Sequence, residues 1–218
     1  MTYLPKHFEE TDPATLHALV RAHPLATWVV PQTDGELLVN HIPFLLDTDR
    51  GPHGTLVGHV ARANPVWRTL AAPGSAATVA VFQGPEAYIS PSWYPGKAIH
   101  GKVVPTWNYA VVHAHGNVRI FEDRAQLLAL VTRLTSLHET GQAQPWQVAD
   151  APADYIDSML AAIVGIEIPV QRWMGKWKVS QNRTMEDQRG VVAGMQARDT
   201  ANTQAMAALV QSKVNLKN

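Results

Sequence analysis

Apolar and polar residues alternate with a period of two over much of this chain, the spacing that predicts half-buried β-strands. Residues 25–47 show it clearly, because two apolar and β-branched runs flank the turn sequence QTDGE, a pattern typical of a β-hairpin. The segment 75–91 reads as two strands separated by Gly84-Pro85. Further strands are predicted within residues 54–65, 107–123 and 164–181.

Helical spacing is clearest where a capping residue comes first. Thr11 or Asp12 precedes one apolar helical face and Asp123 precedes another. Together these elements predict a mainly β, α+β fold, with a small barrel-like core of five to seven short, mostly antiparallel strands and peripheral helices. No strand leads into a glycine-rich phosphate turn and a helix, which disfavours a Rossmann domain or a P-loop. The predicted helices are 11–23, 65–71, 124–139, 153–163 and a weakly patterned stretch from about residue 186.

Composition limits the class of protein. The 218 residues are 46% hydrophobic, which is enough for the core of one domain with appendages. Cysteine is absent, so no disulfide framework, thiolate nucleophile or thiolate metal ligand is expected. The first residues lack the basic-then-apolar pattern of a signal peptide, and apolar runs such as LATWVV are too short to cross a bilayer. We expect a soluble cytoplasmic protein that makes no membrane contact.

The charges are balanced overall but unevenly distributed. The chain has 18 basic and 18 acidic residues, and this balance argues against extended DNA binding, which depends on a basic surplus. Between Arg50 and Phe121, however, Glu86 is the only acid, alongside several cations and five histidines. Residues 168–185 form a second acid-free run with four cations. If the two runs meet, they predict a compact anion site that suits a small phosphorylated ligand better than a duplex.

The segment 90–109, SPSWYPGKAIHGKVVPTWNY, contains two Trp, two Tyr, two Lys and no acid. It is poor material for a regular helix, yet it is too aromatic for an ordinary solvated loop. One interpretation is an aromatic wall with cations for an anionic ligand. The other is that the four aromatic side chains plug the end of a β-structure. The segment by itself leaves both interpretations open.

Two further stretches carry polar residues at strand ends. In LVGHVARANPVW, residues 56–67, Arg62 and His59 precede a helix start, so they could hold a phosphate there, although Asn64-Pro65 is equally typical of a plain helix cap. In GKWKVSQNR, residues 175–183, the polar run SQN could contact the edge of a heterocycle, although the lysines could also form a solvated strand face.

Other reaction chemistries are poorly supported. His113 and His115 form an H-x-H pair that could ligate a metal or haem, but no third ligand is apparent, so no metal site is predicted. Ser90 and Ser92 lack the G-x-S-x-G pattern of a nucleophile elbow. No paired carboxylates lie near the aromatic segment, which argues against glycosidase chemistry. No catalytic residue is identified.

The ordered blocks YLPKHF, HIPF, GHVARANPVW, FQGPEAYISPSWY, KVVPTWNYAVVHAHG and KWKVSQNR resemble the PaiB family, bacterial FMN-binding negative transcriptional regulators of the split-barrel flavoprotein superfamily. The resemblance covers residues 3–195. It implies a six-stranded FMN-binding split β-barrel that forms a homodimer with one FMN at each end of its interface. By motif position it implies phosphate contacts from His59, Val60, Ala61, Arg62 and Asn64, a second set of contacts from Lys178, Gln181 and Asn182, and ring contacts from Trp107 and Asn108.

The resemblance also sets the predicted organisation and the alternatives. Residues 1–195 are expected to form one split-barrel domain with helical appendages, and residues 196–218 a helical or flexible tail. The leading hypothesis is an FMN-binding regulator of PaiB type. The alternatives are a flavin-dependent oxidoreductase or flavin reductase and a haem-binding relative with His41, His59, His113 or His115 as ligand. Direct DNA binding stays open, because no helix-turn-helix is recognisable.

Overall fold

The computed structural model describes residues 2–71 and 77–215. Contacts divide the chain into two compact units, each assembled from separate stretches of sequence. Unit 1 contains Met1–Ala22, Gln83–Val112 and Met174–Asn218, and unit 2 contains His23–Phe82 and His113–Trp173. Each unit therefore depends on segments that lie far apart in the sequence.

Most of the strands are joined in one antiparallel sheet. The strands of the described chain are β1 (Glu9–Glu10), β2 (Leu25–Pro31), β3 (Leu37–Pro43), β4 (Leu45–Asp47), β5 (Thr55–Ala61), β6 (Thr78–Ile89), β7 (Thr106–Gly116), β8 (Arg119–Phe121) and β9 (Ile163–Lys178). Hydrogen-bonded neighbours follow the order β3-β2-β6-β7-β9-β5-β4, and β1 and β8 also pair with β9. The predicted mainly β fold with peripheral helices is confirmed. The strands are more numerous than predicted, β6 and β9 are long rather than short, and the strand predicted within residues 107–123 is divided after Gly116 into β7 and β8.

The helices lie at the predicted places except for the short α3, which forms within the segment 90–109 that was expected to lack a regular helix. They are α1 (Pro13–Ala22), α2 (Val66–Ala71), α3 (Gly96–His100), α4 (Arg124–Glu139), α5 (Ala153–Ala161), α6 (Met185–Arg198) and α7 (Ala201–Asn215), with short 3-10 turns η1 (Lys6–Phe8), η2 (Pro91–Trp93) and η3 (Val148–Asp150). Asp12 caps α1 by accepting from the Thr15 amide at 2.9 Å. Asp123 caps α4 by accepting from the Gln126 amide at 2.9 Å. None of the helices in the described part of the chain is long and apolar enough to cross a membrane.

The core of unit 2 forms on the inner face of the β2–β3 hairpin and its neighbours. The two strands pair in register from Leu25 with Pro43 to Pro31 with Leu37. Trp28 on β2 is fully buried and meets the Phe44 ring edge-on at 6.1 Å. Full burial of a ring such as Phe44 stabilises the fold by about 2 kcal/mol. The alternation seen in the sequence therefore sets which hairpin face is buried.

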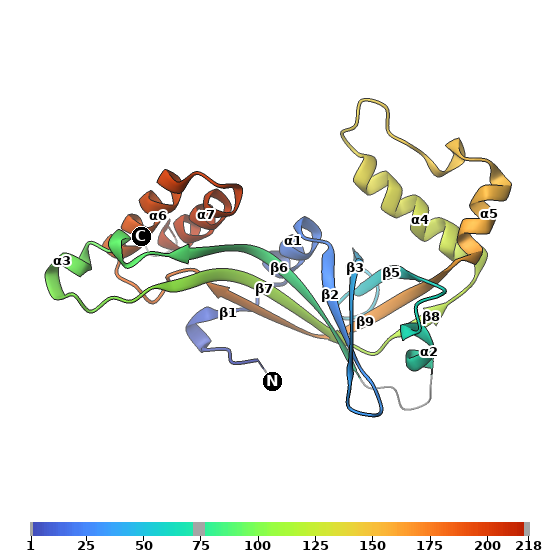
Figure 1. The fold of residues 1–218 in the computed structure, drawn as a ribbon, viewed down its shortest axis with the longest axis horizontal. Helices are drawn as coiled ribbons and strands as arrows, with labels where there is room; N and C mark the ends of the chain where they lie inside the picture. Colours follow the sequence, from blue (N-terminus) through green and yellow to red (C-terminus); the bar gives the residue numbers. More distant parts are fainter. Residues whose placement is uncertain (1, 72–76, 216–218) are drawn as a thin grey trace. The chain divides into compact units, whose positions relative to one another are not determined.

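Unit 1 combines strand segments with α1, α6 and α7. Leu16 and Leu19 on α1 are buried and lie against Gly175 and Gly84, where an added Cβ would come within 2.3 and 2.8 Å of these side chains. Helices α6 and α7 pack against each other, as the red ribbons in Figure 1 show. The buried methionines Met195 and Met206 come from these two helices.

The predicted break at Gly84-Pro85 is wrong, because β6 runs unbroken from Thr78 to Ile89. Gly84 is needed for the close approach of Leu19, not for a turn. Strand β2 pairs with β6 only over residues 79–81, so the missing N–H of Pro85 leaves no bond to β2 unmade. Residues 75 and 76 of the predicted segment lie outside the described residues.

The C-terminal stretch continues the helical structure beyond residue 195. Helix α7 has buried side chains, among them Val210 and Val214, and Lys213 forms an ion pair with Glu10 at 2.9 Å. Residues 216–218 lie outside the described chain. The division into a domain of residues 1–195 and a tail of residues 196–218 stays a prediction.

Candidate functional site

The residues predicted to contact the phosphate lie in unit 2, at the end of β5. His59, Val60 and Ala61 are its last residues, and β5 pairs with β9 so that His59 lies opposite Gly165. The Val60 side chain is buried in the core, so only its backbone could contact a ligand. Ala61 is exposed at the strand end.

The Arg62 guanidinium is held by three groups of unit 2. Nε donates to the Ala161 carbonyl oxygen at 2.7 Å, Nη2 donates to the Ile163 carbonyl oxygen at 3.1 Å, and Nη1 bonds to the Glu122 carboxylate. A guanidinium has five N–H groups, so two remain for another ligand. Arg62 therefore ties the end of β5 to the junction of α5 and β9, and it keeps some capacity to bind an anion.

Asn64 caps the following helix. Its Oδ1 accepts from the Val66 amide at 3.0 Å, and its Nδ2 donates to Asn40 Oδ1 at 2.7 Å. The side chain is thereby fixed between α2 and β3. The helix-cap interpretation of Asn64-Pro65 is confirmed, while a phosphate contact from Asn64 stays a prediction.

Among these residues at the end of β5, His59 has a buried nitrogen, Nδ1, without a hydrogen-bond partner in the described chain. Burial also lowers the pKa of His59 below its ordinary value of 6.5, so the imidazole is neutral near pH 7. A buried polar atom without a partner costs about 1–3 kcal/mol, and a bound molecule could supply the missing partner.

The remaining candidates lie in unit 1, at the start of β7 and the end of β9. The Lys178 ammonium donates to Thr106 Oγ1 and to the Trp107 carbonyl oxygen. The Trp107 ring is 53% exposed and meets Tyr88 edge-on at 6.1 Å. Lys178 and Trp107 are therefore brought together, with an aromatic surface open beside a cation.

The turn that follows β9 is fixed by buried polar bonds. Asn108 is buried and its Nδ2 donates to Ser180 Oγ at 2.9 Å. Ser180 has a positive φ of 63°, and Gln188 Nε2 donates to its carbonyl oxygen at 2.9 Å. Gln181 closes the same turn, because its Oε1 accepts from the Val179 amide at 2.7 Å.

The remaining candidates of this turn differ in their exposure to solvent. Asn182 is exposed in the turn, where its amide can reach a ligand. Asn108 and Gln181 instead hold the turn in place, so direct flavin contacts from these two residues stay predictions.

Lys176, Lys178 and Arg183 lie close together in unit 1. Lys176 is only 7% exposed, donates to the Tyr3 carbonyl oxygen at 2.9 Å and lies 5.3 Å from the centre of the Tyr109 ring. Within the described chain no salt bridge involves Lys176, Lys178 or Arg183. Burial lowers the pKa of Lys178, and the charges of Lys176 and Arg183 lower it further. This cluster therefore attracts an anion.

Most aromatic side chains of residues 90–109 are structural. Trp93 lies against Gly190 and Gly194 of α6, where an added Cβ would come within 2.1 Å of the Trp93 carbonyl oxygen and 2.3 Å of its ring, respectively. Tyr94 is buried with the Arg183 guanidinium 4.9 Å from its ring centre. Trp107 is the member of the four that is most open to solvent. Trp93 and Tyr94 are therefore packing residues, while a ligand contact from this segment stays a prediction.

Sequence reasoning missed the residues of α6 that hold this segment. Asp187 Oδ1 accepts from the Gly96 amide at 3.0 Å, and the glycines at 190 and 194 admit Trp93. The spacing G-V-V-A-G was a visible signal, because residues four apart lie on one face of a helix.

The histidine pair of β7 has no metal-site geometry around it. The His113 and His115 rings are 6.3 Å apart. Burial and the charge of Arg172 lower the pKa of His115. Over residues 2–71 and 77–215, no group of three or more His, Asp or Glu side chains is placed to hold a metal ion.

Each unit thus contains residues that fit one part of FMN. A phosphate needs positive charge and hydrogen-bond donors; in unit 2 the charge comes from Arg62, and the neutral His59 could add a hydrogen bond. A flat isoalloxazine with polar edges needs an apolar face and donors, which Trp107 and Lys178 offer in unit 1. The chemistry of the two donor sets therefore matches the phosphorylated flavin that the sequence implies.

The comparisons with known proteins agree with this chemistry. Residues 2–172 match the family described as "Putative FMN-binding domain". The chain is 32% identical over 212 residues to the protease synthase and sporulation protein PAI 2 of Bacillus subtilis, covering 97% of this chain and 98% of that protein. It is also 32% identical over 247 residues to the uncharacterized protein AN0679 of Emericella nidulans, covering 99% and 98%.

Solved structures share the fold at lower identity. The FAD and haem binding protein from Mycobacterium smegmatis matches with a TM-score of 0.57 and 19% identity, over 78% of this chain and 73% of that one. The flavocytochrome Anf3 from Azotobacter vinelandii matches with a TM-score of 0.58 and 14% identity, over 81% and 72%. At these identities the likeness concerns the fold alone, and it agrees with the split β-barrel expected from the sequence.

Proposed function

Because the chain belongs to the PaiB family of FMN-binding split-barrel proteins, we propose that it is a cytoplasmic, homodimeric regulator that binds FMN. FMN is the cofactor that the family match supports. The relatives of this chain are bacterial and fungal. The proposed role therefore concerns the flavin site and names no regulated process.

The observation that carries the proposal is the cationic cluster of unit 1. Lys176, Lys178 and Arg183 have no carboxylate partners in the described part of the chain, and uncompensated positive charge in partly buried surroundings is stabilised by an anionic ligand. Bound FMN supplies redox chemistry. Lys178 would favour negative charge on the flavin, and the exposed Trp107 ring would shield its apolar face from water.

Unit 2 has its own residues suited to a phosphate. Arg62 has two uncommitted N–H groups, and His59 has its buried Nδ1 without a partner. Val60 and Ala61 would contribute backbone groups, because the Val60 side chain is committed to the core. Asn64 would keep the end of β5 in position through its two hydrogen bonds.

The homodimer is proposed from exposed apolar surface in unit 1. Exposed apolar side chains that gather into a patch mark interfaces, and a twofold dimer would form two equivalent flavin sites. The exposed apolar side chains of unit 1 include Tyr3, Tyr88, Ile99, Val104 and Trp107.

A regulatory role would depend on a partner or on a small basic surface. The chain has zero net charge, and non-specific DNA affinity comes mainly from a surplus of cations. The alternative function is a flavin-dependent oxidoreductase, in which the flavin would react and Lys178 would stabilise the reduced form. A haem-binding relative would instead use a histidine such as His59 or His115 as ligand.

The absorption spectrum of the purified protein, followed by anaerobic addition of NADH or NADPH, separates these functions. We expect flavin bands, and no flavin reduction at a rate that supports turnover. Rapid reduction by either nucleotide would instead establish the oxidoreductase. A haem Soret band without flavin bands would overturn the FMN proposal.

A further inference from the structure

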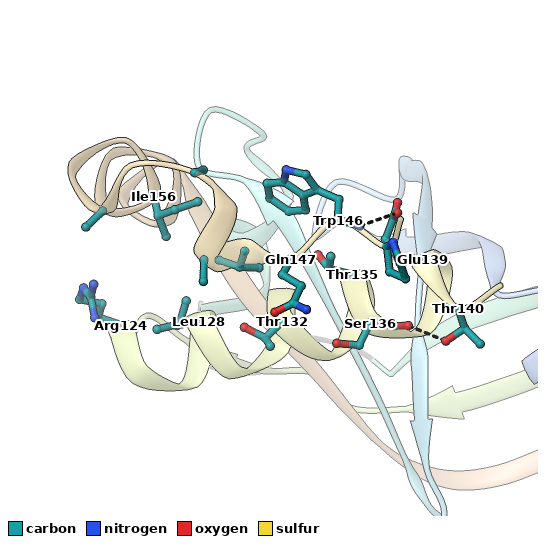
Figure 2. A pocket seen from close by; sticks show the side chains of 15 residues that line it. Arg124, Leu128, Thr132, Thr135, Ser136, Glu139, Thr140, Trp146, Gln147 and Ile156 are labelled. Carbon is teal, nitrogen blue, oxygen red and sulfur yellow. Dashed lines mark hydrogen bonds between the residues drawn. The ribbon is translucent and has the colours of Figure 1, made fainter. Parts of the chain in front are cut away.

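A second concave site lies in unit 2, between α4, the loop of residues 140–152 and α5. Its volume is about 770 Å³, which is within the range of small-molecule sites. Figure 2 shows α4 along one side and the loop with Trp146 above it. None of the residues that line this cavity belongs to the candidate flavin groups. The cavity therefore needs an explanation of its own.

The α4 side of the cavity carries a row of hydroxyl groups. Thr132, Thr135 and Ser136 line it, and their spacing of three and four residues places them on one face of the helix. Within residues 2–71 and 77–215, none of these three hydroxyl groups makes a side-chain hydrogen bond. The helix fills its other face with the buried Leu130 and Leu134, so the hydroxyl row serves no core packing.

The opposite side of the cavity is largely apolar, and the Gln147 amide also lines it (Figure 2). It includes Pro145, Trp146, Val148 and Ile156, and Trp146 keeps 45% of its surface exposed. The Trp146 amide donates to Glu139 Oε2 at 3.0 Å, which fastens the loop to the end of α4 (Figure 2). The cavity thus offers a ligand hydrogen-bonding groups on one wall and mainly apolar surface on the other.

Arg124, the cation at the cavity, is already paired. The Arg124 Nε donates to Asp157 Oδ1 at 2.9 Å, and the Glu139 carboxylate accepts the Trp146 amide. An anionic ligand would lose hydration without gaining an unpaired cation here, and the Glu139 carboxylate would repel it. An uncharged ligand meets no such penalty.

We propose that this cavity binds a neutral, flat aromatic molecule that carries a hydrogen-bonding group on one edge. Its ring packs against Trp146 and the apolar loop residues, and its polar edge exchanges hydrogen bonds with the hydroxyl row of α4. The residues that line this cavity are different from the candidate flavin residues. The cavity would therefore give the protein a second ligand that does not compete with FMN for the same side chains.

Equilibrium dialysis of the FMN-loaded protein with naphthol tests this proposal. We expect saturable binding that Trp146→Ala weakens about tenfold, because the stacked ring surface is lost. Ser136→Ala and Thr132→Val should each weaken it about fivefold, the effect of one neutral hydrogen bond. Tyr155→Ala and Ser158→Ala are matched controls on α5 that do not line the cavity and should leave naphthol binding unchanged.

Two analogues of the probe separate the parts of the proposal. Naphthalene lacks the hydroxyl group and should bind about fivefold more weakly than naphthol. Naphthoate is charged and should bind more weakly still. Absence of saturable naphthol binding, or binding that persists unchanged in both Trp146→Ala and Ser136→Ala, would overturn the proposal. Equal affinity for naphthoate would overturn the requirement for a neutral ligand.

Discussion

Replacing Gly190 with alanine is expected to destabilise the protein by about 1–3 kcal/mol, the usual cost of forcing an atom into packed surroundings. The added Cβ would come within 2.1 Å of the Trp93 carbonyl oxygen, and backbone cannot move aside as a flexible side chain can. Helix propensity alone predicts the opposite sign, because alanine is favoured over glycine by about 1 kcal/mol inside a helix. Urea unfolding of the two proteins measures the difference.

Gly194→Ala provides a sharper test of the same contact. Its Cβ would come within 2.3 Å of the Trp93 ring rather than its backbone. Removing the ring in Trp93→Ala should therefore relieve most of the penalty of Gly194→Ala and little of the penalty of Gly190→Ala. The exposed Ala193 lies on the same helix, and Ala193→Gly reports the propensity term alone. A Gly190→Ala protein more stable than the parent would contradict this packing of α6 against residues 93–96.

Arg62→Ala is expected to reduce both FMN affinity and stability. If the guanidinium contacts the phosphate, losing a charge-assisted bond worth about 1.5–3 kcal/mol lowers FMN affinity by roughly ten- to a hundredfold. The bonds to the Ala161 and Ile163 carbonyl oxygens are lost as well, which we expect to cost about 1 kcal/mol of stability, since the ion pair with Glu122 is solvent-exposed and weak. Flavin titration and urea unfolding measure the two effects separately.

Two further variants separate the roles of Arg62. Arg62 lies 6.0 Å from the centre of the Trp67 ring and Arg68 lies 5.1 Å from it, so Arg68→Ala removes a neighbouring cation and should leave FMN affinity unchanged. Glu122→Gln breaks the ion pair but keeps the Arg62 charge, so it should lower stability slightly without weakening FMN binding. Unchanged FMN affinity in a folded Arg62→Ala protein would remove Arg62 from the phosphate site and leave it a structural residue of unit 2.

Local signals in the sequence predicted most elements of the fold. Asp12 and Asp123 cap their helices as expected, because a cap depends on residues only two or three positions away. The hairpin of residues 25–43 follows from alternation and a glycine turn, both of which are local. The fold class could therefore be predicted without knowledge of any distant contact.

Contacts between distant segments could not be predicted in this way. Gly84-Pro85 looks like a strand break, and only the position of Leu19 on another segment shows that the glycine serves packing. The partners of Arg62 lie about one hundred residues away in sequence, at Ala161 and Ile163. The same limit concealed the role of Gly190, whose neighbour Trp93 belongs to a separate stretch of unit 1.

Sedimentation analysis of the FMN-loaded protein tests the central claim most directly, namely that the protein binds FMN as a homodimer. We expect a dimer that carries one FMN for each chain, and a dimer fraction that rises with FMN concentration, because a ligand stabilises the state that binds it. A monomer that binds FMN with the same affinity as the dimer would contradict the account.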